Sequence, residues 1–271
     1  MPMREYLKSI RLVFLISNEV ARSALKEKMM YGFLLLALLF ILMANVPFMA
    51  QEANVFEGQA PEVAAVQIGF VAINIFTILI AVFVSVNTLQ NFLDREHLVL
   101  FLSKPVKRWQ ILEGVIFGLL KMIFLNWFLM TAGIWLVLVS QTKTLCFYVW
   151  PGMAVTLLMA LLYVTLIVFF YCLIPNAASG VLAVLVMIAG FGASLAKDVF
   201  LSSSYPPFIK KIFLLTLDAL PKINGLWGIS MSQLKLFALD VPIAFLLAHT
   251  ILLAFVLNLA CVWRFRRFCQ F

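Results

Sequence analysis

Six uninterrupted apolar stretches constrain this chain more than any other feature of its sequence. They lie near residues 31–49, 68–90, 115–139, 147–174, 180–196 and 241–263. About 20 helical residues cross the ~30 Å hydrocarbon core of a bilayer, and a spanning segment must satisfy its own backbone hydrogen bonds. None of the stretches shows the period-two alternation of a membrane β-strand. The sequence therefore predicts an all-α polytopic membrane protein with six transmembrane helices, forming one transmembrane domain over residues 1–271.

The composition agrees with a chain whose solvent is lipid. Apolar residues make up 65% of the 271 residues and charged residues only 12%, whereas about a quarter of the residues in a soluble domain are charged. So few charges could not cover the surface of a water-soluble fold of this size. Most of the surface is expected to face the membrane.

The first 28 residues form a separate basic segment. Its apolar core, Leu12 to Ile16, is too short for a cleaved signal peptide, and no small-residue cleavage site follows it. Leu7, Ile10, Phe14, Ala21 and Leu25 fall near one helical face, with basic residues around them. This pattern predicts an amphipathic helix lying in the inner membrane interface.

The distribution of charge predicts which side of the membrane each connection faces. With a cytoplasmic amino terminus, six spans put the 91–113 connection and the carboxyl terminus on the same inner side. All eight arginines then lie inside, the outer segments carry no net charge, and the whole +8 falls on the inner side. This is the positive-inside asymmetry of a cell (inner, cytoplasmic) membrane protein. It accounts for the basic composition, so no nucleic-acid partner is expected.

The second predicted span carries a polar stripe. Asn74, Thr77, Ser85 and Thr88 recur at helical spacing on one face. Such a stripe either lines a substrate pathway or makes hydrogen bonds between helices, because polar groups in hydrocarbon take whatever partner they find. Both interpretations stay open.

Other residues in the predicted spans favour packing roles. Gly114 and Gly118 form a GxxxG pair that permits close helix approach, within one chain or between two. Lys121 is placed to extend its stem to the inner surface. The four cysteines, Cys146, Cys172, Cys261 and Cys269, show no CxxC spacing. They are predicted to be packing residues, with no disulfide and no metal site.

Two connections have distinct expected shapes. Residues 175–179 predict a tight inner turn between the fourth and fifth spans, because Pro175 cannot continue a helix. The outer segment 197–240 has helical apolar spacing interrupted by Pro221, and it reads equally as a loop resting on the membrane or as an outer gate.

The inner connection holds most of the remaining information. From Asp94 to Gly118 it reads DREHLVLFLSKPVKRWQILEGVIFG, which is rich in both charge signs and too polar to cross a bilayer. A short surface helix, a break at Pro105 and an aromatic anchor at Trp109 predict a rigid cytoplasmic protrusion over residues 93–112.

This connection resembles that of the permease subunits of ATP-binding-cassette (ABC) transporters of the second exporter class (ABC-2 type). Those subunits show an acidic-basic cluster, a short helix and an LSKPVSRW…GK pattern entering the next span. Here Leu102 to Trp109 read LSKPVKRW, followed by Gly114 and Gly118, and weaker similarity covers most of the chain. The chain looks most like the nitrous-oxide-reductase maturation permeases. It departs from the pattern at His97, Glu113 and Val115.

The resemblance implies a coupling helix that docks into a cytoplasmic ABC ATPase subunit. The implied docking residues are Asp94, Arg95, Glu96, His97 and Leu98. The implied turn that transmits motion contains Ser103, Lys104, Pro105, Lys107, Arg108 and Trp109. ATP and magnesium would be bound by the partner ATPase, with no cofactor on this chain, and a second permease copy would complete a homodimer working as an exporter.

No catalytic chemistry is expected in this polypeptide. It contains no GxxxxGK[ST] phosphate-binding loop, no HExxH and no GxSxG. One alternative is an ion-driven secondary transporter, which predicts acidic residues deep in the spans, and none lies inside the six stretches. A second alternative is a non-transporting membrane scaffold or assembly factor that uses the same helices only for packing.

Overall fold

The computed structural model describes residues 3–52, 61–93, 106–202, 208, 211, 214, 217, 220–233 and 243–268. Over these residues the chain is helical and contains no strand, so the predicted all-α class is confirmed. The elements are α1 (Met3–Leu25), α2 (Lys28–Leu42), the 3-10 turn η1 (Met43–Asn45), α3 (Val46–Glu52), α4 (Pro61–Leu93), α6 (Arg108–Thr142), α7 (Val149–Leu173), α8 (Ala178–Ser202), α10 (Ile223–Gln233) and α11 (Ile243–Phe268).

Five helical segments in the described part of the chain are long and apolar enough to cross a membrane. They are Met30–Met49, Pro61–Phe92, Trp109–Thr142, Val149–Leu173 and Ile243–Phe265. Each coincides with one of the predicted spans. The predicted span 180–196 lies within α8, whose apolar stretch Ala178–Ala193 falls in the class of shorter helices. The structure therefore shows five candidate spans and fits a multi-pass membrane protein, and the count of six is not confirmed.

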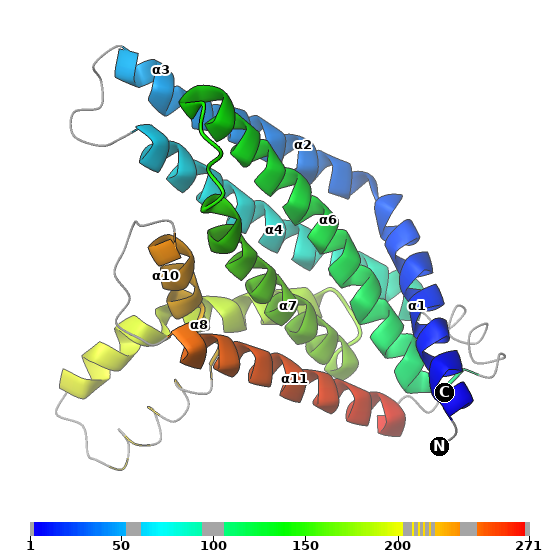
Figure 1. Cartoon of the computed structure of the whole chain (residues 1–271). Helices are drawn as coiled ribbons and strands as arrows, with labels where there is room; N and C mark the ends of the chain where they lie inside the picture. Colours follow the sequence, from blue (N-terminus) through cyan, green and yellow to red (C-terminus); the bar gives the residue numbers. More distant parts are fainter. Residues whose placement is uncertain are drawn as a thin grey trace.

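The amino-terminal helices run alongside α6 and in the same direction (Figure 1). Ile16 of α1 lies against Gly114 of α6, and further along Ile41 of α2 lies against Gly133. Near the far end, Asn45 Oδ1 accepts a hydrogen bond from Gln141 Nε2 at 3.1 Å. Residues 3–45 are thus matched to nearly the whole length of α6, which at 1.5 Å per residue is about 52 Å long.

Helix α4 runs antiparallel to α2 and lies in the centre of the bundle with α7. Phe40 of α2 and Phe76 of α4 pack edge to face, with ring centroids 5.5 Å apart. Of the apolar stretches, 67% of the α7 stretch and 61% of the α4 stretch are buried, against 22% for α2 and for α11. Helices α2 and α11 therefore form the periphery of the described bundle, with most of their apolar side chains exposed.

Two breaks in the helices follow from local residues. Pro47 has no backbone N–H, and the chain tightens into the 3-10 turn η1 just before it, so α2 and α3 are separate helices. Between α7 and α8, Asn176 Oδ1 accepts a hydrogen bond from the N–H of Ala178 at 2.8 Å. The predicted tight turn at 175–179 is confirmed, because α7 ends at Leu173 and α8 begins at Ala178.

Helix α10 belongs to the outer segment 197–240, and it packs into the bundle. Leu226 is completely buried, and the ring of Trp227 packs edge to face on Phe70 of α4, with centroids 4.9 Å apart. This part of the segment is therefore more than a loop resting on the membrane surface. Its role as an outer gate stays a prediction.

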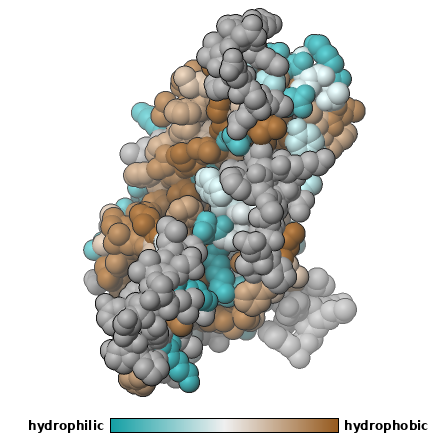
Figure 2. Space-filling view, turned by 90° about the vertical axis from the view of Figure 1, so that its left-hand side faces the viewer, coloured by the Kyte–Doolittle hydropathy of each residue, from teal (hydrophilic) through white to brown (hydrophobic). Residues whose placement is uncertain are grey.

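The described surface is largely apolar. Brown, hydrophobic side chains occupy much of the coloured surface in Figure 2, and hydrophilic ones gather near the upper end and in a central patch. Six aromatic side chains cluster where α6 approaches the start of α7: Phe124, Trp127, Phe128, Trp135, Phe147 and Trp150. The opposite end of the bundle is where α1 begins, α6 begins and α11 ends (Figure 1).

Candidate functional site

The connection between α4 and α6, which was predicted to lie on the inner side, is only partly described. The predicted residues Asp94, Arg95, Glu96, His97, Leu98, Ser103, Lys104 and Pro105 lie outside the described residues. Lys107 is the N-cap of α6, with extended backbone angles (φ −75°, ψ 141°). Arg108 and Trp109 are already in the first turn of α6. The predicted turn therefore ends at Lys107, because the helix starts earlier than the apolar pattern indicated.

A buried glutamine fixes the first turn of α6. Gln110 Oε1 accepts a hydrogen bond from the backbone N–H of Lys107 at 2.8 Å, and the Gln110 N–H donates to the Lys107 carbonyl at 2.9 Å. The side-chain bond is one half of a capping box. Only 2% of Gln110 is exposed. The first turn of α6 is thus anchored in the bundle through Gln110, which protects this helix end from fraying.

The GxxxG pair at the start of α6 receives α1. A Cβ built on Gly114 would lie 2.6 Å from Ile16 Cγ2, and one on Gly118 would lie 2.5 Å from Val20 Cβ. These contacts are within one chain, which settles what the sequence left open for this pair. The predicted amphipathic helix is present, but it packs lengthwise on α6 as part of the bundle. Small residues allow this approach, since dispersion drives helix association in lipid.

Lys121 reaches α1 as well. Its Nζ donates to Asn18 Oδ1 at 2.7 Å and lies 3.8 Å from the centroid of the Phe14 ring. The ammonium group of Lys121 therefore has a carbonyl oxygen and an aromatic face as partners on α1, and its extension to the inner membrane surface stays a prediction. This polar contact helps to fix the position of α1 along α6.

The joint between α1 and α2 is tied to the end of α4. Glu27 is the N-cap of α2, but its carboxylate makes no cap bond to that helix. Its two oxygens instead accept hydrogen bonds from Asn87 Nδ2 at 3.0 Å and Asn91 Nδ2 at 3.5 Å. The two asparagines are one turn apart on α4, just before the helix ends at Leu93.

Glu113 links the start of α6 to α11. Asn258 Nδ2 donates to Glu113 Oε2 at 3.4 Å, across 145 residues of sequence. At this position the chain departs from the ABC-2 permease pattern. In the structure the side chain of Glu113 makes a contact between two helices.

Five helices, α1, α2, α4, α6 and α11, are therefore tied together where the 94–107 connection begins and ends. Sequence reasoning missed Glu27, Asn87, Asn91 and Asn258 among the polar residues that do this, and named Glu113 only as a departure. The available signal was that each interrupts or borders an apolar stretch. Polar groups in such places are expected to find partners on other helices.

The polar stripe of α4 is buried in the bundle. Asn74, Thr77, Ser85 and Thr88 are between 0% and 3% exposed, and Asn74 Nδ2 donates to the Phe70 carbonyl at 2.9 Å. The hydroxyls of Thr77, Ser85 and Thr88 have no hydrogen-bond partner among the described residues. In this conformation the stripe faces packed helices, and its role in lining a pathway stays a prediction.

Replacing Thr77 by valine is expected to raise the free energy of unfolding by about 1 kcal/mol, because it removes a buried hydroxyl that has no partner while keeping the side-chain shape. Thr165→Val on α7 is the matched control, since the Thr165 hydroxyl donates to the carbonyls of Leu161 and Leu162 at 3.0 Å. That control should lower the thermal midpoint in detergent. If the thermal midpoint fell equally in both variants, the Thr77 hydroxyl would have a hydrogen-bond partner after all.

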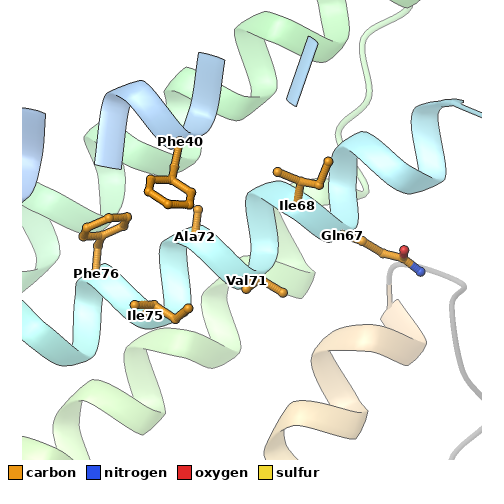
Figure 3. Close-up of a pocket in the computed structure, with 7 residues that line it drawn as sticks. All are labelled: Phe40, Gln67, Ile68, Val71, Ala72, Ile75 and Phe76. Atoms are coloured by element: carbon orange, nitrogen blue, oxygen red, sulfur yellow. The ribbon is translucent and has the colours of Figure 1, made fainter. Parts of the chain in front are cut away.

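An apolar groove of about 310 Å³ lies between α2 and α4 (Figure 3). Its lining residues are Phe40, Gln67, Ile68, Val71, Ala72, Ile75 and Phe76. None of the predicted pathway residues contributes to it. Among the residues with described placement, no three His, Cys, Asp or Glu side chains lie close enough to hold a metal ion.

Comparison with known proteins adds no relative. No protein-family model matches the chain, and no curated protein matches it. The resemblance to ABC-2 permeases therefore rests on the sequence alone, chiefly on residues 102–109.

Proposed function

We propose that this chain is the membrane-spanning permease subunit of an ABC exporter driven by a separate ATPase subunit. One observation carries the proposal. The connection that resembles the coupling region joins α4 to α6, and the ends of these helices are tied to α1, α2 and α11 through Glu27, Gly114, Gly118 and Glu113.

Such an arrangement suits the transmission of force. Helices α4 and α6 have 33 and 35 residues, the greatest lengths among the described helices. A partner that grips the 94–107 connection would move both helices, and α1 with them, as one body. Rigid-body movement of packed helices is one of the ways in which proteins convert binding at one site into a change at another.

The proposed partners follow from the resemblance of the 94–107 connection to the coupling region of ABC-2 permeases. A cytoplasmic ABC ATPase would bind ATP and magnesium and would dock on Asp94 to Leu98. A second copy of this chain would complete the transport path, and the termini would face the cytoplasm from the inner membrane. Closing of the ATPase pair would then shift the helices between inward- and outward-open populations.

Exchanging the charges of the connection should release the ATPase. The tagged protein is purified in mild detergent as wild type and as a Glu96→Lys, Arg108→Glu double variant, and ATP hydrolysis is assayed in the eluate. We expect the variant to retain less than a tenth of the co-purified activity, because a loss of 1.4 kcal/mol in binding lowers affinity tenfold.

The matched control is Glu19→Lys, Arg22→Glu on α1. This exposed pair, 3.4 Å apart, also exchanges one acid and one base without changing the net charge. It should co-purify as much ATPase as wild type. Wild-type protein that elutes without an ATP-hydrolysing chain from several mild detergents would rule out the proposed function.

Glu113 favours a second candidate, an ion-driven transporter. The six predicted stretches held no acid, but the structure extends the third span to Trp109–Thr142, which places Glu113 inside a membrane-length helix. If no ATPase co-purifies, proteoliposomes with an imposed proton gradient decide this candidate. A wild-type proton flux, read with an internal pH dye and lost in Glu113→Gln, would support it.

A further inference from the structure

Two cysteines from different helices meet near the inner end of the bundle. Cys172 is the penultimate residue of α7, and Cys261 lies in α11. Their side chains are within hydrogen-bonding contact, and both are free thiols. Sequence spacing gave no sign of this pair, because 89 residues separate its members.

Two charged residues lie close to the pair in the fold. Arg264 is one turn beyond Cys261 on α11, and Glu113 of α6 accepts a hydrogen bond from Asn258, one turn before Cys261. A cation beside a cysteine supports the thiolate that attacks.

Solvent access makes Cys172 the member of the pair that an oxidant reaches first. Cys261 is completely buried, whereas Cys172 is half-buried and is followed by Leu173 and Ile174, which are 41% and 42% exposed. The exposed turn at Pro175 comes next. A small oxidant arriving from the aqueous side meets Cys172 first, and Cys261 lies behind it as the resolving thiol.

We propose that Cys172 and Cys261 are an oxidisable dithiol that links α7 to α11 through a reversible disulfide, with a hydroperoxide as the oxidant and Arg264 as the residue that supports the attacking thiolate.

The reaction balances in two steps. The Cys172 thiolate attacks one peroxide oxygen, an S–O bond forms, the O–O bond breaks, and the leaving hydroxide takes a proton to become water. The Cys261 sulfur then attacks the Cys172 sulfenic acid, the S–S bond forms, the S–O bond breaks, and the leaving hydroxide takes the Cys261 thiol proton to become a second water. The thiols lose two electrons to the peroxide, and a cellular dithiol reverses the change.

A disulfide here would join two helix ends beside the Glu113–Asn258 contact. Any movement of α11 relative to α7 would then be blocked until the bond is reduced. The inner side of a cell membrane is reducing, and disulfides that form there are transient and redox-sensing. This consequence depends on the proposed sidedness, whereas formation of the disulfide does not.

The test uses a full-length Cys146→Ser, Cys269→Ser variant, which keeps only Cys172 and Cys261. The purified protein in detergent is treated with hydrogen peroxide, unfolded in sodium dodecyl sulfate and labelled with a mass-tagged maleimide. We expect two labels before oxidation, none after it, and two again after reduction. Peptide mass spectrometry should find the 172 and 261 peptides joined within one chain.

Cys146 supplies the matched control. It is a buried cysteine in the connection before α7, at the end of that helix away from Cys172, and its sulfur lies 3.5 Å and 3.4 Å from the hydroxyls of Thr142 and Thr144. A variant that keeps Cys146 and Cys172 alone should form no disulfide within the chain. Two labels that persist in the Cys172/Cys261 variant after peroxide, or linkage only between chains, would overturn the proposal.

The role of Arg264 is tested by the rate at which the disulfide forms. Arg264→Gln should slow disulfide formation about tenfold at fixed pH, because one unit in thiol pKa changes the thiolate fraction tenfold. Arg264→Lys keeps the charge and should restore the rate to within about threefold of wild type. Equal rates in wild type and Arg264→Gln would overturn the role of Arg264.

Discussion

Replacing Gly118 by alanine is expected to lower the free energy of unfolding by about 2 kcal/mol, within the usual range for overpacking a tight contact. The new Cβ would lie 2.5 Å from Val20 Cβ and 2.8 Å from the carbonyl oxygen of Ser17. Both atoms belong to α1, and a backbone carbonyl cannot rotate out of the way. Helix α1 would have to move off α6, which also weakens the Lys121–Asn18 contact three residues further on.

The measurement is the thermal midpoint in detergent, together with the rate of trypsin cleavage at the exposed Arg11 and Arg22 of α1. Gly133→Ala on the same helix is the control, because a Cβ there would lie 3.5 Å from Ile41, an ordinary contact. Alanine in a helix is favoured over glycine by about 0.5–1 kcal/mol, so this control should melt at or above the wild-type midpoint. If the two variants melted together and were cleaved alike, the close packing of α1 on α6 would be refuted.

Replacing Gly190 of α8 by alanine is expected to lower the free energy of unfolding by about 2–3 kcal/mol. A Cβ on Gly190 would collide with the carbonyl oxygen of Pro221, which precedes α10. The proline ring restricts the backbone at that point, so relief requires α8 or the start of α10 to shift. The packing of Trp227 between Phe70 and Phe191 depends on the same placement.

Gly192→Ala is the control for this prediction, two residues along the same helix. A Cβ on Gly192 meets no atom within 4 Å. Thermal midpoints of the two variants in detergent should therefore differ by several degrees, with Gly190→Ala the lower. Indistinguishable midpoints would show that α10 does not pack against α8 as described.

The first prediction also bears on the proposed function. If α1 and α6 move as one body, Gly118→Ala should weaken coupling to an ATPase without touching the docking residues. The second prediction concerns the outer segment, whose packing through α10 joins α8 to the centre of the bundle. Neither variant alters a charge, so a change in either assay reports on helix packing alone.

Most helices could be predicted from the sequence, because the requirement that makes them is local. A stretch of about 20 apolar residues in lipid must bond its own backbone, and five of the six predicted stretches are membrane-length helices. Their ends were less predictable. Helix α6 begins at Arg108, ahead of the apolar run at 115, since a buried Gln110 caps its first turn.

The polar contacts of the candidate site could not be predicted in the same way. Glu27 meets Asn87 across 60 residues and Glu113 meets Asn258 across 145, so no sequence spacing indicates either pair. Cys172 and Cys261 were predicted to be unrelated packing residues for the same reason. In lipid an apolar helix face gains no hydrophobic energy by contacting another helix instead of hydrocarbon. The hydropathy of the sequence therefore does not indicate which helices pack together.

The sequence by itself determined that this chain is helical, that it fits a membrane, and that its basic residues gather in a few connections. Only the tertiary structure decided that α1 packs along α6, that five helices are tied at the ends of the 94–107 connection, and that two thiols meet. The physical reason is that helix formation in lipid depends on each segment alone. Helix pairing depends instead on small residues and polar side chains that become neighbours only in the folded bundle.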